Sequence, residues 1–185
     1  MVVLGCLAAI PAMAQSATDY RAEVNFWLQD AETKLVGLAQ AMPQEKYTWR
    51  PGEGVRSVSE VFMHVAGGNY MIPRMIGAPP STSFTREMQT WTDKAKVIEA
   101  LQQSFAYVRQ AVSAVPDADL DKPLKVFGRD STYRGAMMLL ATHAHEHLGQ
   151  AIAYARSNSV VPPWTAEAEA RRAAQPAKQP AKQPQ

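Results

Sequence analysis

Cysteine is almost absent from this sequence, because Cys6 is the only one among 185 residues. A single cysteine excludes a disulfide framework and the cysteine-rich class of zinc sites. Cys6 also lies in an N-terminal segment that we expect to be removed on export, which would leave the mature chain without a thiol. Any thiol that takes part in a reaction of this protein would then have to come from a substrate.

An excess of charge of one sign is lacking as well. The chain has 19 Lys and Arg residues and 17 Asp and Glu residues, for a formal net charge of +2. From Ala166 onward there are four basic and two acidic residues, so the remaining chain carries equal numbers of each sign. Because nucleic-acid binding depends on neutralising phosphates, this neutral body excludes nucleic acid as the expected partner.

No apolar run is long enough to cross a membrane as a helix, which needs roughly 20 residues. The run Met1 to Ile10 is followed by Pro11 and by the small-residue motif Ala12-Met13-Ala14. This order is typical of the apolar region and cleavage site of a secretory signal peptide, although no Lys or Arg precedes the run. We predict that residues 1–14 are a signal peptide cleaved after Ala14, and that the mature protein is periplasmic or secreted.

The C-terminal end has a different composition. Residues 175–185 repeat Gln-Pro-Ala-Lys and contain no large apolar side chain to bury, which is typical of disorder. The length of the chain suits one domain. We therefore predict a single domain over residues 15–165, followed by a disordered Pro/Lys/Gln-rich tail over residues 166–185.

Four segments show the periodicity of amphipathic helices, with apolar residues at spacings of three and four. The first covers residues 24–42 and is ended by Pro43, and the second covers residues 57–72. The second begins with the capping box Ser57-Val-Ser-Glu60 and is weakened in its middle by Gly67-Gly68. The third runs from about Thr90 to Pro116, with Asp93 in its first turn, and the fourth runs from about Asp130 to Ala155. No stretch alternates convincingly as a strand does. We expect an all-α protein, a four-helix bundle whose loops allow a crossover connection.

All four histidines lie on the predicted second and fourth helices. His143 and His147 are four residues apart, so both imidazoles project from one helix face and can reach one ion. His145 lies roughly 200° around the helix from His143, which excludes it from such a site. His64 lies at the edge of the apolar stripe of the second helix, so packing of the two helices would bring it to the pair.

This spacing leaves alternatives open. A single histidine at the edge of a helix face, such as His64, more often packs or faces solvent than binds a ligand, and histidine pairs four residues apart also arise by chance. The string from His143 to His147 is not the His-Glu-x-x-His motif of metalloproteases. A bundle whose histidines only pack is therefore an alternative to a metal site.

The chain resembles the DinB/YfiT-like family of metal-dependent proteins over about residues 20–164. The resemblance rests on Ser57-x-x-Glu60-x-x-x-His64, on His143-x-x-x-His147-Leu-Gly-Gln150, and on the loop Lys46-Tyr-Thr-Trp-Arg-Pro51. It implies an up-down-down-up four-helix bundle with a crossover, often a homodimer, whose metal ligands are His64, His143 and His147. The implied ion is divalent, with nickel or zinc most often found in such proteins and manganese or iron as alternatives.

The resemblance also implies a class of reaction, since the family includes transferases that add small thiols to electrophiles. We expect an exported metal-binding protein that acts on a small-molecule substrate as a metal-dependent thiol transferase or hydrolase. Three imidazoles leave a coordination position open, where water or a thiol can be activated. Glu60 or Glu146 could orient an imidazole, and Gln150 could hydrogen-bond near the site. The alternative is a non-enzymatic periplasmic protein that binds a metal or a small ligand.

Overall fold

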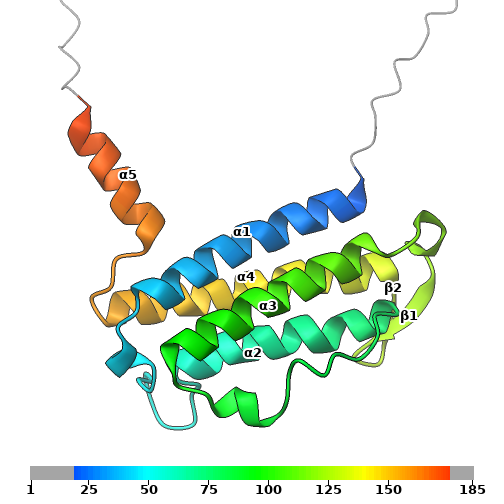
Figure 1. The fold of residues 1–185 in the computed structure, drawn as a ribbon. Helices are drawn as coiled ribbons and strands as arrows, with labels where there is room; N and C mark the ends of the chain where they lie inside the picture. Colours follow the sequence, from blue (N-terminus) through cyan, green and yellow to red (C-terminus); the bar gives the residue numbers. More distant parts are fainter. Residues whose placement is uncertain (1–18, 176–185) are drawn as a thin grey trace, which may run out of the picture.

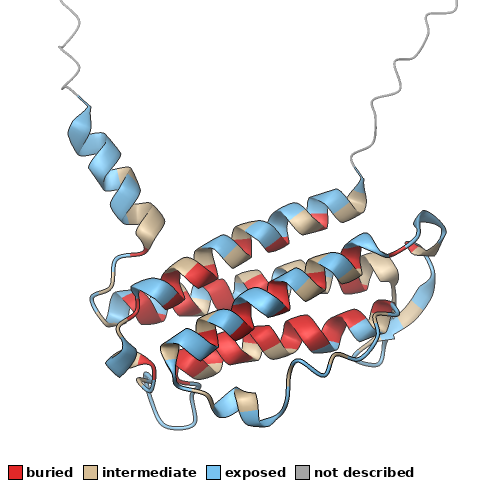
Figure 2. Ribbon diagram, in the orientation of Figure 1, coloured by how far each residue is buried: buried red, intermediate tan, exposed pale blue. Residues whose placement is uncertain are grey.

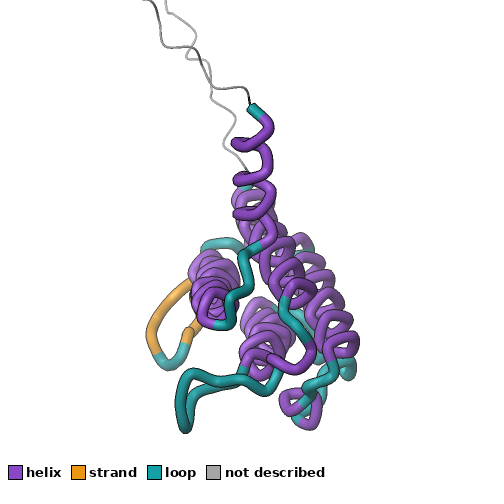
Figure 3. Tube along the Cα trace, turned by 90° about the vertical axis from the view of Figure 1, so that its left-hand side faces the viewer, coloured by secondary structure: helices purple, strands orange, loops and turns teal. Residues whose placement is uncertain are grey.

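Four long helices pack side by side in the computed structural model, which describes residues 19–175 (Figure 1). They are α1 (Tyr20–Ala41), α2 (Val58–Met71), α3 (Lys94–Ser113) and α4 (Tyr133–Ser157). Both α1 and α2 pack against α3 and α4, so the order around the bundle is α1, α3, α2, α4. Figure 3 shows this arrangement nearly end-on. The predicted signal peptide and residues 176–185 of the predicted tail lie outside the described residues.

The direction of the helices confirms the expected up-down-down-up bundle. Helices α1 and α4 run one way, whereas α2 and α3 run the other way (Figure 1). Because α2 and α3 are parallel, the chain between them must return along the length of the bundle. This crossover contains the 3-10 helices η2 (Ile72–Ile76) and η3 (Glu87–Thr90), and η3 packs on α2. Two further short turns are η1 (Gln44–Lys46) and η4 (Asp117–Asp119).

Each long helix begins at a residue whose side chain accepts a backbone N–H. The predicted capping box of α2 is confirmed: the Ser57 hydroxyl accepts from Glu60 N, and the Glu60 carboxylate accepts from Ser57 N. Asp93 is the N-cap residue that precedes α3, and its carboxylate accepts a hydrogen bond from the backbone N–H of Lys96. Thr132 caps α4, which therefore begins at Tyr133 rather than near Asp130.

The expectation that the chain has no strands is wrong at one place. An antiparallel hairpin of β1 (Pro123–Val126) and β2 (Arg129–Thr132) precedes α4. Its turn residues Phe127 and Gly128 have φ values of 48° and 81°, the left-handed conformation of a type I′ turn. The strands have four residues each, and burial alternates along β1 but not along β2. A pattern this short cannot be recognised in the sequence as a strand. The turn Phe127-Gly128 also lacks the Asn or Asp that usually marks a type I′ turn, so the sequence does not reveal the hairpin.

The core lies between the four helices, where the buried faces meet (Figure 2). The predicted apolar stripe of α1 is confirmed, and the whole predicted stripe of α2 is buried. In α3 the three-and-four spacing that runs back from Leu101 predicts Ile98 as a buried residue, but Ile98 is only half-buried and its neighbour Val97 is fully buried instead. Since the outer faces of the helices are polar, none of them within residues 19–175 is apolar enough over a sufficient length to cross a membrane.

A fifth helix, α5 (Pro163–Ala174), occupies residues that the sequence prediction divides between the domain and the disordered tail. It has no buried residue and projects away from the bundle (Figures 1 and 2). Pro163 suits the first turn of a helix, and the alanines, glutamates and arginines that follow are strong helix formers. The predicted boundary at residue 165 therefore falls inside a helix.

Candidate metal centre

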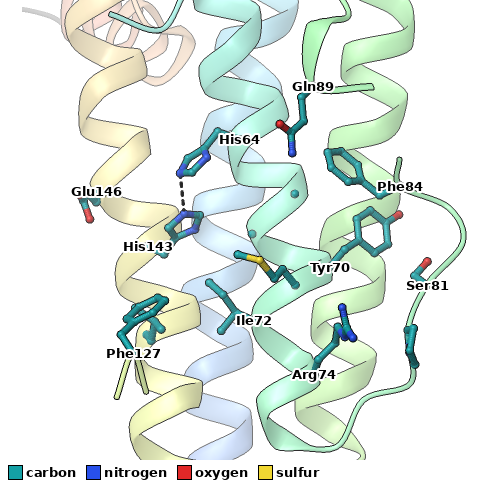
Figure 4. A pocket seen from close by; sticks show the side chains of 15 residues that line it. His64, Tyr70, Ile72, Arg74, Ser81, Phe84, Gln89, Phe127, His143 and Glu146 are labelled. Atoms are coloured by element: carbon teal, nitrogen blue, oxygen red, sulfur yellow. Dashed lines mark hydrogen bonds between the residues drawn. The ribbon is translucent and has the colours of Figure 1, made fainter. Parts of the chain in front are cut away.

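Three histidines from two helices meet at one point between α2 and α4. His64 on α2 and His143 and His147 on α4 each offer a ring nitrogen, and these three atoms lie within 4.8 Å of one another. The Nε2 atoms of His64 and His143 are 3.3 Å apart, the contact drawn as a dashed line in Figure 4. The ring centroid of His147 lies 4.5 Å from that of His64 and 4.7 Å from that of His143. The structure thus brings together the three histidines singled out in the sequence.

The donor set fits a divalent transition metal. Two nitrogens bound to one tetrahedral zinc at 2.0–2.1 Å lie roughly 3.3 Å from each other, which matches the separation between His64 and His143. Imidazole nitrogen suits zinc, nickel, copper and iron, whereas magnesium and calcium prefer oxygen ligands. The cluster therefore indicates a divalent metal, and the ligand type points away from the alkaline-earth ions.

A chain of hydrogen bonds holds the imidazole of His147 in place. Its Nδ1 lies 2.9 Å from Gln150 Oε1, so Nδ1 donates and Nε2 keeps its lone pair for an ion. Gln150 Nε2 donates to the Tyr154 hydroxyl at 3.0 Å, and that hydroxyl donates to the carbonyl of Arg56 at 3.1 Å. The expectation that Gln150 hydrogen-bonds near the site is confirmed.

The two candidate orienting carboxylates behave differently. Glu60 is engaged elsewhere, because its carboxylate accepts from Ser57 N at 2.7 Å and from Arg50 at 3.2 Å. The expectation that it orients an imidazole is therefore wrong, and the capping box is the reason. Glu146 makes no hydrogen bond to an imidazole within residues 19–175, but it lines the cavity beside His64 and His143.

Burial keeps two of the imidazoles uncharged near neutral pH. Desolvation lowers the pKa of His64 from 6.5 to about 4, with a smaller contribution from the positive charge of Arg56. Desolvation also lowers the pKa of His143 to about 4, and its proximity to His147 adds to the shift. A neutral imidazole has a lone pair free for coordination, so both residues are ready to bind a metal without first releasing a proton.

These pKa shifts predict how the metal-free protein responds to acid. The pKa of His64 and His143 is lower in the folded chain, so between pH 6.5 and about 4 the unfolded chain binds more protons. We expect the melting temperature of the chelator-treated protein to fall as the pH is lowered through this window. Scanning calorimetry at several pH values measures this slope. The double variant His64→Asn/His143→Asn should show a flatter one, and an unchanged slope would contradict the assignment.

His145 lies on the other side of α4, as the helical spacing predicts. Its Nδ1 donates to the carbonyl of Ala141 at 2.8 Å, and its Nε2 lies 3.5 Å from an oxygen of Asp30 on α1. The ring also meets the edge of Trp27. His145 thus joins α4 to α1 and does not face the other three histidines.

Gly68 is a site residue that the histidine pattern does not reveal. A Cβ atom at this position of α2 would lie 2.3 Å from Cε1 of His143, far inside van der Waals contact. The adjacent Gly67 makes similar room for the ring of Phe84, at 3.1 Å. Glycine weakens a helix interior by about 1 kcal/mol, so a pair there signals a close approach. In the sequence this pair reads only as a weak point of the helix.

A cavity of about 570 Å³ opens beside the histidines (Figure 4). His64, His143 and Glu146 line one end, and Arg74 from η2 lines it as well. The crossover contributes Phe84 and Gln89, and the tip of the hairpin contributes Phe127. This volume is in the usual range for a small-molecule site. The sequence could not place these residues, because they come from loops whose paths only the tertiary structure determines.

Comparison with known proteins identifies the family. The sequence model of the DinB superfamily matches residues 28–151, about two thirds of the chain. None of the curated proteins matches this sequence significantly.

The fold is shared with solved structures at low sequence identity. A DinB-like protein from Bacillus cereus superposes with a TM-score of 0.66 at 17% identity, covering 78% of this chain and 93% of the other. A DinB-like protein from Bacillus subtilis has a TM-score of 0.60 at 16% identity, with coverages of 75% and 93%. YfiT from Bacillus subtilis, described as a probable metal-dependent hydrolase with an unusual four-helix bundle topology, has a TM-score of 0.62 at 14% identity, with coverages of 85% and 97%. The helical bundle, its three-histidine cluster and the matched residues together show that the chain belongs to the DinB superfamily.

Proposed function

We propose that this protein is a metal-dependent hydrolase of a small molecule, with a divalent ion held by His64, His143 and His147. The observation that carries the proposal is the convergence of three imidazoles, within 4.8 Å, at the wall of a cavity large enough for a substrate. The shared fold with YfiT, described as a probable metal-dependent hydrolase, supports the same class of reaction.

The residues around the cluster suit hydrolysis. When bound, a divalent ion supplies Lewis acidity that polarises a carbonyl and makes water a better nucleophile. Gln150 holds His147 in the tautomer that leaves Nε2 free, and Gly68 lets His143 approach His64. Glu146 is the carboxylate that lines the cavity, and we assign to it the role of accepting the proton from the attacking water.

The ion is zinc or nickel in this proposal, with manganese and iron as the alternatives to be tested. A site of three nitrogens without a carboxylate ligand favours the later transition metals over manganese. Metal analysis of the purified protein identifies the ion. Stoichiometric manganese in protein purified from a medium that contains all four metals would contradict this choice.

Turnover tests the proposed reaction. Protein loaded with each metal in turn is incubated with esters and amides, and separately with small thiols and electrophiles. We expect hydrolysis that falls at least about a hundredfold in Glu146→Gln, because a general base contributes on that order. Glu60→Gln is the matched control, since its carboxylate caps α2 instead. If the protein turned over only the mixtures of thiol and electrophile, its activity would be thiol transfer and the proposal of hydrolysis would be wrong. Stoichiometric metal with no turnover would favour a metal or small-ligand binding protein.

We also propose that the protein is exported. The support is the apolar run of residues 1–10 followed by Ala12-Met13-Ala14. We expect the full-length chain, expressed in a bacterial host, to yield an extracytoplasmic product that begins at Gln15, as mass spectrometry can determine. Ala14→Phe places a large residue at the cleavage position and should leave the precursor intact. An unprocessed wild-type chain in the cytoplasmic fraction would contradict export.

A further inference from the structure

The cavity beside the histidines differs in character from one end to the other. Its His64 and His143 end carries the candidate metal centre and Glu146, whereas Arg74 lies at the opposite end (Figure 4). Between them the wall is mostly apolar, with Ile72 the central side chain in the view. His64 and Arg74 are ten residues apart along α2 and η2, which corresponds to roughly 15 Å along the helix axis. A bound molecule that reaches both ends must therefore be elongated.

Among the described residues that line this cavity, Arg74 is the one cation. Within residues 19–175 its guanidinium makes no ion pair and no hydrogen bond, whereas Arg109 pairs with Glu32 and Arg134 with Asp121. η2 places Arg74 immediately after the buried residues Ile72 and Pro73, which anchor this turn against the bundle. Arg74 is exposed at the edge of the cavity on a segment whose neighbours are buried, so its five donors are available to a ligand.

A flat aromatic wall lines the same cavity. The rings of Tyr70 and Phe84 are stacked, with centroids 5.6 Å apart and planes inclined by 26°. Tyr70 also packs against Tyr107, whose ring centroid lies 5.0 Å away, and the ring of Phe84 lies over Gly67, where a Cβ atom would crowd it. Such a surface favours a planar ring of a ligand by offset or edge contacts.

We infer that the cavity takes a substrate with an aromatic body and one carboxylate, which pairs with Arg74 while the reacting group lies at His64 and His143. This inference rests on the proposed function and names its substrate class. A carboxylate matches the planar fork of a single guanidinium. A phosphate ester is disfavoured, because a dianion calls for more than the single cation that this cavity offers among its described lining residues. An N-acyl derivative of an aromatic amino acid has the required parts, namely an aromatic ring, a free carboxylate and a separate amide bond that can be hydrolysed.

Binding of two matched probes tests the inference. 4-Phenylbutanoate and its uncharged amide are titrated calorimetrically into the protein, as purified with its metal and again after chelation. Wild type is compared with Arg74→Gln and with Arg156→Gln, an exposed arginine at the far end of α4. We expect the carboxylate to bind at least about tenfold more weakly to Arg74→Gln in both metal states, because a hydrogen bond to a charged group is worth about that factor. The amide should bind all three proteins alike.

Two results would overturn the inference. Carboxylate affinity that is unchanged in Arg74→Gln, or that is lost on chelation alone, would place the anion at the histidines instead. If the wild type bound the amide and the carboxylate with equal affinity, the cavity would not select a negatively charged ligand. The metal-free titrations do not depend on catalysis. They therefore show whether Arg74 selects a carboxylate even if the protein has no hydrolase activity.

Discussion

Chelation is expected to lower the melting temperature of the wild-type protein by about 8–16 °C. A metal present at a thousand times its dissociation constant stabilises the folded chain by about 4 kcal/mol, and 1 kcal/mol corresponds to about 2–4 °C for a domain of this size. In His147→Ala the effect of the chelator should vanish together with stoichiometric metal binding. Scanning calorimetry with and without chelator, together with metal analysis of each protein, measures both quantities.

His145→Ala is the matched control for that experiment. It removes a histidine from the same helix, two residues away, whose ring faces α1 instead of the cluster. We expect this variant to keep its metal and its full response to the chelator, even if its melting temperature is lower. A wild type that carries no stoichiometric metal and does not respond to chelator would show that the histidines only pack.

Gly68→Ala is expected to disrupt the metal centre without changing any ligand. The added Cβ would lie 2.3 Å from Cε1 and 2.9 Å from Nδ1 of His143, so the imidazole must move away from α2 and from His64. We expect metal affinity to fall about 10–100-fold, the usual effect of disturbing a residue that supports a ligand. Overpacking should also cost about 1–3 kcal/mol of stability, more than the helix propensity gained from alanine. Metal titration by calorimetry and thermal unfolding measure the two effects.

Gly149→Ala provides the comparison, because the same substitution is made in α4 where the new Cβ has no neighbour within 4 Å. At that position the substitution increases helix propensity without causing a steric clash. We expect stability to rise by about 0.5–1 kcal/mol and metal affinity to stay the same. Two glycine variants with equal metal affinity would show that His143 tolerates a side chain at position 68 and that the close approach has no role.

The four long helices of the bundle were predictable because their causes are local. The Ser57 capping box, the proline that follows α1 and the three-and-four spacing of apolar residues each act within a few turns of one helix. The pairing of His143 with His147 is local for the same reason, since four residues nearly complete one turn. His64 is different, because its place at the edge of a helix face fits a packing role as well as a ligand, and the family resemblance is what favours it as a ligand.

Local patterns along the chain therefore account for the four amphipathic helices, for the two histidines on one face of α4 and for the exclusion of His145. The tertiary structure decided what depends on residues far apart in the chain. Packing of α2 on α4 placed His64 beside His143, and the fit of that imidazole against α2 explained Gly68. The crossover and the hairpin brought Phe84 and Phe127 to a cavity that ends at Arg74. The physical reason is that a helix sets only its own periodicity, whereas the contacts between helices and loops depend on how all the apolar faces are buried together.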